Sequence, residues 1–241
     1  MRTDRRKLMV SSRKNDMYEL LGKALRFHPY INNSYSKFIS SWDTSKVTDL
    51  RRCFQECRSL QSLDLSSWDT SNLQSLRYTF SGGVNEIIMP DLSKANMLNS
   101  LYCTWYENSR IKKLDISKLN TKNVIAFGWC FDGAVNLEWL DISGFDLSRA
   151  ETYGISDFFG RNRMLTHLIL GEGFGKIPTG VTFNMSSFAS LDEESKASFM
   201  SLYDRKANGL PNVTLKLKTS FGFSEEQIQS LTNKGYTINL V

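Results

Sequence analysis

Hydrophobic residues return in short triplets at a nearly constant spacing along the chain. The triplets begin at Leu63, Ile87, Leu114, Leu140 and Leu168, which gives spacings of 24, 27, 26 and 28 residues. A second ladder, made of aromatic residues, keeps the same period at Phe54, Phe80, Tyr106, Phe131 and Phe159. Two ladders with one period predict a structural unit that is repeated along the chain.

The parts of one unit can be interpreted from residues 62–80. In Leu63-Asp64-Leu65 the leucines share one face of a short strand and the aspartate lies on the other, because side chains alternate along a strand. The polar stretch SSWDTSN follows, and its short side chains can turn the chain and cap a helix. Leu73, Leu76 and Phe80 then recur at helical spacing. Each unit is therefore predicted to be a strand, a corner and a helical segment.

One such unit cannot bury its own apolar face, whereas stacked copies share a continuous core. The fold class predicted for residues 37–189 is therefore an α/β solenoid. It has one short parallel strand per repeat on the concave face and irregular or helical segments on the convex side. A degenerate first copy of the strand is predicted to end at Ile39, before Trp42.

The motif LDLSSWDTSN, preceded by Phe54-Gln-Glu-Cys57, resembles the BspA-like leucine-rich repeat family of microbial surface proteins. The resemblance covers about residues 37–170, and it weakens where IIMPDLSKAN keeps the spacing but loses Trp-Asp-Thr-Ser. It implies a leucine-rich-repeat solenoid and a role in adhesion or recognition. The ending SEEQIQSLTNKGYTINLV resembles the closing segment of repeat proteins encoded in phage and prophage tail regions, which implies a virion component.

The two ends of the chain are predicted to cap this solenoid. Residues 1–36 form a basic tail and a cap helix opened by Asp16-x-x-Glu19, with a partner-binding helix as the alternative. Residues 190–241 continue the stack with a helix opened by Ser190-x-x-Glu193 and closed by Gly209. A strand over 213–217, a helix opened by Ser224-x-x-Gln227 and a strand over 236–240 complete this C-terminal part.

Net charge separates the tail from the body. Residues 1–30 hold eight basic and three acidic residues, which accounts for the whole net charge of +5, while 22 basic and 22 acidic residues balance over the rest. Any affinity for an anionic polymer would therefore lie in the tail, and no specific nucleic acid is expected. The tail is predicted to be a solvated, poorly ordered terminus, with an anionic-polymer binder as the alternative function. No apolar run reaches the length of a membrane span, and the first residues lack the apolar region of a signal peptide, so export by that route is not expected. These features predict a virion or cytoplasmic location, with a cell-surface location only if the chain is a fragment.

Candidate chemistry is sparse. The four cysteines, at positions 53, 57, 103 and 130, lack a metal-ligand pattern and are predicted to be buried free thiols, and no cofactor is expected. The chain has two histidines but no Gly-x-Ser-x-Gly motif, so a Ser-His-Asp triad is not expected. A glycan-degrading enzyme is the alternative, because Asp115 and Asp141 would lie on neighbouring strands at a separation that suits a glycosidase. The repeat itself explains these aspartates more simply, so the protein is predicted not to be an enzyme.

The outward strand positions supply the candidate binding site. Trp139 is predicted to point away from the core with Lys113 and His167 on either side, and tryptophan is a frequent anchor in interfaces. The full set of predicted binding residues is Trp139, Lys113, His167, Asp115, Asp141, Asp64 and Glu86. We expect a protein or a surface glycan to bind there. The alternative is that Trp139 only covers its neighbours or lies under a terminal segment. The oligomeric state is left open.

Overall fold

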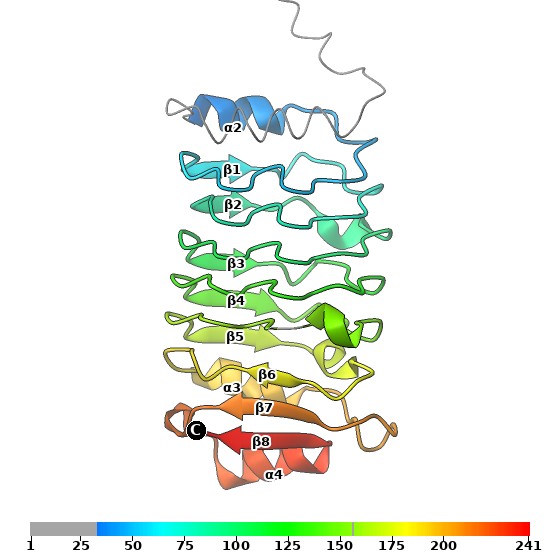
Figure 1. The fold of residues 1–241 in the computed structure, drawn as a ribbon, viewed down its shortest axis with the longest axis vertical. Coiled ribbons are helices and arrows are strands. Elements are labelled where there is room, and N and C mark those ends of the chain that lie inside the picture. The colour runs from blue at the N-terminus through cyan, green and yellow to red at the C-terminus, as the bar shows by residue number, and fades with distance from the viewer. Residues whose placement is uncertain (1–32, 156) are drawn as a thin grey trace, which may run out of the picture.

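The computed structural model describes residues 33–155 and 157–241. Successive turns of the chain lie one above another along the long axis (Figure 1). The α-helices are α2 (Asn33–Ser40), α3 (Glu193–Met200) and α4 (Glu225–Asn233), and short 3₁₀ helices occupy Leu92–Lys94, Thr152–Ile155, Glu172–Lys176 and Thr219–Phe221. The strands are β1 (Ser62–Asp64), β2 (Glu86–Ile88), β3 (Lys113–Asp115), β4 (Trp139–Ile142), β5 (His167–Leu170), β6 (Thr182–Asn184), β7 (Val213–Leu217) and β8 (Tyr236–Leu240).

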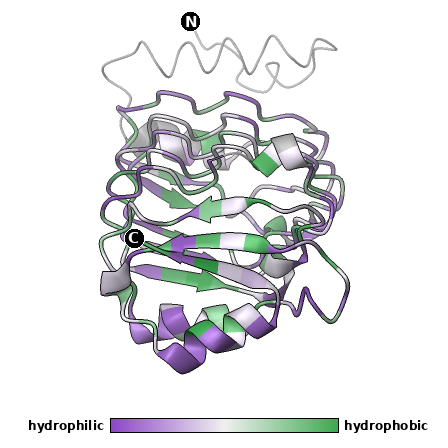
Figure 2. Ribbon diagram, turned by 60° about the horizontal axis from the view of Figure 1, so that its bottom comes forward, coloured by the Kyte–Doolittle hydropathy of each residue, from purple (hydrophilic) through white to green (hydrophobic). Residues whose placement is uncertain are grey.

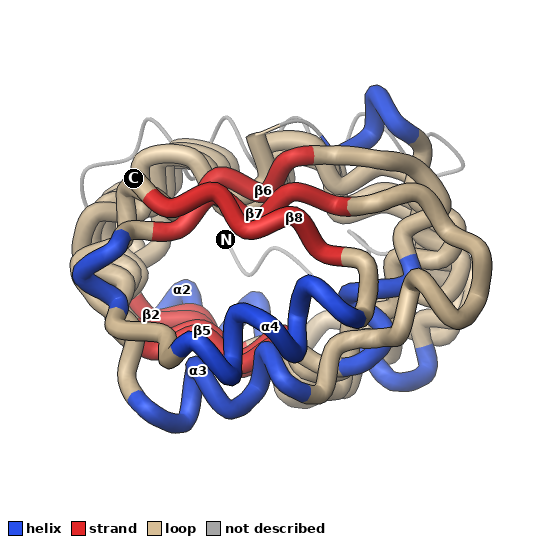
Figure 3. The backbone as a smooth tube through the Cα atoms, turned by 90° about the horizontal axis from the view of Figure 1, so that it is seen from below, coloured by secondary structure: helices blue, strands red, loops and turns tan. Residues whose placement is uncertain are grey.

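The strands do not form one continuous sheet. They divide into three small parallel sheets, with the orders β1-β2, β3-β4-β5 and β6-β7-β8. Seen along the stack, β6, β7 and β8 lie on the opposite side of the molecule from β2 and β5 (Figure 3). The predicted leucine-rich-repeat solenoid, with one strand per repeat on a single concave face, is therefore wrong.

The helical segments predicted between the strands are also absent from the described part of residues 65–150, apart from the 3₁₀ helix at Leu92–Lys94. Leu73, Leu76 and Phe80 lie in tight turns instead, as shown by Leu73 N donating to Thr70 O and Thr79 N donating to Leu76 O, both at 3.0 Å. A turn closed by a bond from residue i+3 to residue i repeats its apolar positions every three or four residues. The spacing of Leu73, Leu76 and Phe80 therefore matched that of a helix although these residues lie in turns.

Backbone hydrogen bonds between successive turns replace the predicted helices. On the side of the stack opposite β1 and β2, every second residue donates its N–H to a carbonyl of the next turn. Arg52 N donates to Arg77 O at 3.0 Å, and Tyr78 N donates to Tyr102 O at 3.1 Å. Isolated parallel bridges mark the start of this ladder in each turn, at Asp49, Ser75, Ser100 and Ala126.

Each of these turns contains residues in the left-handed region of φ. The non-glycine examples are Arg52, Glu56, Tyr78, Cys103, Glu107, Trp129, Asp157 and Arg161, with φ between 46° and 59°, and Gly82 and Gly133 occupy equivalent places. Left-handed backbone costs an L-residue roughly 1–2 kcal/mol. The inter-turn hydrogen bonds offset that cost by holding the backbone in register.

The polar phrase Trp68-Asp69-Thr70-Ser71-Asn72 builds the corner after β1. The Trp68 side chain is buried, and the Asp69 carboxylate accepts the N–H of Ser71 at 2.9 Å. The Thr70 hydroxyl donates to Asp91 O in the next turn at 2.7 Å, while the Asn72 amide donates to Ser45 O in the previous turn at 2.7 Å. These side chains therefore link three turns at one corner.

The core between the two sides is a column of stacked aromatic rings. Phe54, Phe80, Trp105 and Phe131 stack in order with ring centroids 5.9, 6.0 and 5.2 Å apart. Trp105 takes the place predicted for Tyr106, which is half-buried.

In Figure 2 the strands carry hydrophobic positions between hydrophilic ones, and the C-terminal helices are mostly hydrophilic. All four cysteines are buried thiols, as predicted for packing residues.

The ends of the chain agree only in part with the sequence. The predicted cap helix opened by Asp16 lies outside the described residues, and helix α2 occupies residues 33–40, where a degenerate strand was predicted to end at Ile39. Helix α3 is capped by Asp192 instead of Ser190, and it ends at Met200 instead of near Gly209. The strands over 213–217 and 236–240 are confirmed, as is the capping box of α4 between Ser224 and Gln227.

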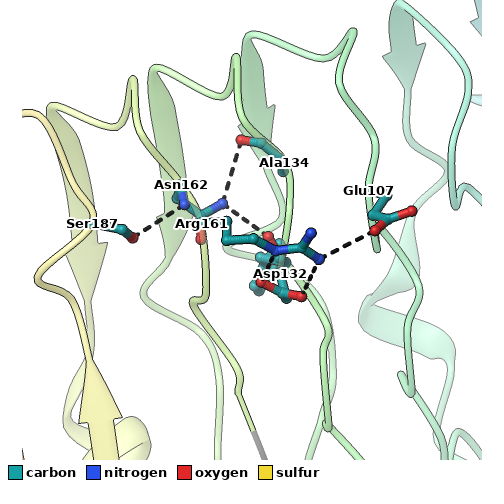
Figure 4. A network of polar contacts seen from close by, with 7 residues as sticks. Glu107, Asp132, Ala134, Arg161, Asn162 and Ser187 are labelled. Atoms are coloured by element: carbon teal, nitrogen blue, oxygen red, sulfur yellow. Dashed lines mark hydrogen bonds and ion pairs between the residues drawn. The ribbon is translucent and has the colours of Figure 1, made fainter.

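A polar network joins three turns on one edge of the stack (Figure 4). Arg161 donates to both carboxylate oxygens of Asp132, at 3.2 and 2.7 Å, and to Glu107 at 3.2 Å. The hydrogen bonds that Arg161 donates to the Asp132 carboxylate raise the pKa of Arg161. The buried amide of Asn162 donates to Phe131 O at 2.8 Å and to Ala134 O at 3.4 Å. Side chains therefore add to the backbone hydrogen bonds that join these turns, such as the one from Glu107 N to Asp132 O at 2.8 Å.

The C-terminal part is held by a buried arginine. The Arg205 side chain is fully buried and donates to the carbonyl oxygens of Gly175 and Ile177, both at 2.7 Å, and to Pro211 at 2.9 Å. Burial lowers the pKa of Arg205. The guanidinium therefore joins the turn that contains β6 to the one that contains β7.

Replacing Arg205 tests this connection. We expect Arg205→Ala to lower the free energy of unfolding by about 3 kcal/mol or more, because several buried carbonyl groups lose their donor. Urea unfolding measures the change. The exposed Arg163 supplies a matched control, and we expect Arg163→Ala to stay within about 0.5 kcal/mol of the parent. Equal losses in the two variants would contradict the assigned role.

Candidate binding site on strands β3 to β5

Three of the predicted site residues lie side by side on the outward face of β3, β4 and β5. The register pairs Lys113 with Trp139 and Trp139 with His167. Alternation of buried and exposed residues along these short strands turns all three side chains away from the core. Lys113 is exposed, whereas Trp139 and His167 are half-buried.

Stacking orders this row of side chains, which we call the Trp139 site. The Lys113 ammonium lies 4.3 Å from the centroid of the Trp139 ring. The His167 ring stacks on the same indole with a centroid distance of 5.0 Å and an interplanar angle of 8°. Trp139 therefore has a cation near one face and an imidazole on the other, so its edge is the part of the ring that faces outward.

Asp192 extends the row and was missed by the sequence prediction. Its Oδ2 lies 2.7 Å from His167 Nδ1, and its Oδ1 accepts the N–H of Ser195 at 2.8 Å as the N-cap of α3. Burial alone would raise the pKa of Asp192, but hydrogen bonds from Ser195 and His167 outweigh it and lower the pKa. The spacing Asp192-x-x-Ser195 was the available signal, since it suits a helix N-cap.

The contacts of Ser195 do not activate its hydroxyl as a nucleophile. Its hydroxyl lies 2.6 Å from Asp192 Oδ1 and accepts the N–H of Leu168 at 2.8 Å. The imidazole of His167 contacts the other carboxylate oxygen of Asp192 instead of this hydroxyl. Ser195 is also fully buried. The serine therefore attaches α3 to β5.

Asp115 and Asp141 lie opposite each other on β3 and β4. Each holds the turn that follows its own strand, because Asp115 accepts from the N–H and hydroxyl of Ser117 at 3.1 and 2.8 Å, and Asp141 accepts from Ser143 N at 2.8 Å. Asp64 makes the same contact with Ser66 N at 2.9 Å. All three aspartates thus have a local role that explains their repetition.

Asp64 and Glu86 belong to the separate sheet β1-β2, so the structure does not join them to the Trp139 site through strand pairing. Leu65 N donates to Ile88 O at 2.9 Å and Ile116 N donates to Asp141 O at 3.1 Å, but among the described residues no corresponding bond joins Met89 to β3. Figure 1 shows the wider spacing between β2 and β3.

This break opens a groove of about 1020 Å³. Its walls include Glu86 and Ile88 from β2, Lys113 and Asp115 from β3, and the nearby Lys118. Ile88 is 50% exposed there. The groove therefore adjoins the Trp139 site through Lys113 and separates that site from Asp64 on β1.

Over residues 33–155 and 157–241, no group of three or more His, Cys, Asp or Glu side chains is placed to hold a metal ion. Within the same residues no helix is long and apolar enough to cross a membrane.

The geometry defines a repeat protein whose turns are joined by parallel backbone hydrogen bonds and whose exposed positions form rows along the stack. The chain belongs to the family described as "Mycoplasma protein of unknown function, DUF285", whose model matches residues 27–101 and 84–169 and so covers more than half of the chain. Comparisons with curated proteins and with solved structures found no match.

The hydrogen bonds that Asp192 accepts from Ser195, together with its contact with His167, make a pH-dependent contribution to stability. The lowered pKa of Asp192 means that this contribution is present above the ordinary carboxyl pKa of 3.8 and is lost as the pH falls through the lower folded value. We expect Asp192→Asn, which keeps an N-cap side chain, to be less stable than the parent at neutral pH and to approach it in acid.

Urea unfolding across the pH range measures this difference. The exposed neighbour Glu194 gives the matched control, because Glu194→Gln removes the same charge from the same helix end. An unchanging gap between the parent and Asp192→Asn from neutral to acid pH would show that the carboxylate charge contributes nothing.

Proposed function

We propose that this protein is a non-enzymatic recognition module that binds a partner through the Trp139 site. The observation that carries the proposal is the ordered row Lys113, Trp139 and His167, which sits on paired strands and is braced by Asp192. A rigid aromatic side chain costs little conformational entropy when it is buried in an interface, and tryptophan is enriched at such positions.

A protein partner suits the site better than a glycan. Sugar rings stack on the open face of an aromatic side chain, whereas Lys113 and His167 occupy both faces of the Trp139 indole. A protein surface can pack on the ring edge and place carboxylates beside the exposed ammonium of Lys113. A glycan would first have to displace the lysine.

The repeat motifs support recognition as the activity. LDLSSWDTSN resembles the BspA-like family of microbial surface proteins, and the match to the DUF285 family covers the residues that carry this motif. The turn contacts of Asp115 and Asp141 give these carboxylates a structural role, which favours binding over glycan hydrolysis. The virion or cytoplasmic location and the phage-tail role stay predictions.

Trp139→Ala tests the proposed function. On arrays of purified surface proteins and of surface glycans, we expect the parent to bind a protein and the variant to bind it more weakly by about 2 kcal/mol or more. The melting temperature should change little, because the indole is only half-buried.

Met97, which is 50% exposed, provides the control, and Met97→Ala should bind as the parent does. Binding that survives the loss of Trp139 would exclude this site as the centre of recognition. Release of sugar fragments from the glycan array would contradict the non-enzymatic assignment.

A further inference from the structure

A second row of aromatic and cationic side chains lies away from the Trp139 site. It consists of Arg52, Arg77, Tyr78, Tyr102 and Trp129, which we call the Arg–Tyr strip. These residues follow the isolated bridges at Asp49, Ser75, Ser100 and Ala126, about half a repeat after each strand. The strip therefore runs along the opposite long side of the stack from β1 to β5.

The members of the strip hold one another in place. The Arg52 guanidinium lies 5.3 Å from the Tyr78 ring centroid, and the Arg77 guanidinium lies 4.6 Å from that of Tyr102. Tyr78 and Tyr102 meet edge to face at 5.8 Å, and Tyr102 meets Trp129 in the same way at 5.4 Å. The side chains are thus ordered before any partner arrives, which reduces the entropy lost on binding.

The backbone at this strip is strained without a gain in core packing. Arg52, Tyr78 and Trp129 have φ of 59°, 57° and 52°, a region that bulky residues rarely adopt. Arg52 is exposed, and the two aromatic side chains are half-buried. Glycine would avoid this strain, as at Gly82 and Gly133 in the parallel row. Cys103 has the same left-handed φ in this row, so the conformation belongs to the repeat and bulky side chains are not required for it.

Within the part of the chain that the structure describes, the two arginines of the strip lack an acidic partner. Arg51 pairs with Asp49 at 3.5 Å and Arg58 pairs with Glu56 at 2.7 Å. No carboxylate within the described ranges forms an ion pair with Arg52 or Arg77, and both guanidinium groups lie over tyrosine rings. Their guanidinium groups remain able to take a carboxylate with two parallel hydrogen bonds.

We propose that the Arg–Tyr strip is a second binding surface, separate from the Trp139 site, that takes an acidic segment of a protein partner. Arginine, tyrosine and tryptophan are the residue types most enriched at the centres of protein interfaces. Single-stranded nucleic acid fits less well, because bases need open ring faces for stacking and guanidinium groups or other rings lie against Tyr78 and Tyr102.

A fluorescently labelled glutamate-rich peptide is the probe, and fluorescence anisotropy at about 0.15 M salt measures its binding. We expect the double variant Arg52→Gln/Arg77→Gln to bind the peptide about 10-fold or more weakly than the parent. The matched control is Arg51→Gln/Arg58→Gln, which removes the same charge from arginines that already have partners. It should lose less than about 2-fold.

Each other outcome overturns the proposal. Equal losses in the two double variants would mean that the strip offers only general positive charge. No binding of the peptide to the parent would mean that the strip does not take an acidic segment. If a single-stranded oligonucleotide or a heparin fragment of equal charge bound more tightly than the peptide and depended in the same way on Arg52 and Arg77, the proposed class of partner would be wrong. Urea unfolding confirms that all variants are folded.

Trp139→Ala separates this proposal from the function proposed above. We expect it to leave peptide binding unchanged, because the two surfaces lie on opposite long sides of the stack. Loss of peptide binding in Trp139→Ala would show that the peptide uses the Trp139 site and that the strip is not a separate surface.

Discussion

The backbone hydrogen bonds that pass from one turn to the next on the side opposite β1 and β2 hold this protein together. The bonds from Leu76 to Ser100 and from Leu101 to Ala126 lie in the turns on either side of the break between β2 and β3. One long side of the stack can therefore lose its strand pairing while the other keeps the turns in register. The groove at that break exists because the strands are not the main connection between these turns.

The same stacking determines what the surface can offer. Turns at a nearly constant period place equivalent residues directly above one another, so exposed side chains form rows such as Lys113–Trp139–His167 and Arg52–Tyr78. Neighbouring strands lie only about 4.8 Å apart, a distance at which flat rings and guanidinium groups stack on each other. Recognition by such rows has to use ring edges and charges, because the faces are already in contact.

Sequence patterns located the elements that depend on local chemistry. The strands around Leu63, Leu114 and Leu140 and the capping box at Ser224 follow from alternation and from side-chain bonds to nearby backbone. The turns over Leu73 to Phe80 were misread as helix because a turn repeats its apolar positions as a helix does. The N-cap role of Asp192 had a local signal, but its contact with His167 and the gap after β2 depend on packing between turns, which no local pattern encodes.

The sheet β6-β7-β8 lies on the opposite side of the stack from β1 to β5, and the hydrogen bonding of the backbone explains this change. A helix satisfies its own N–H and C=O groups, so a turn that carries a helix cannot bond to the next turn on that side. Helices α3 and α4 occupy the side that β1 to β5 use earlier in the chain (Figure 3), with α3 packed on β5. Pairing between the last turns therefore has to occur on the opposite side. There β7 and β8 pair over five residues each, compared with three for β1 and β2.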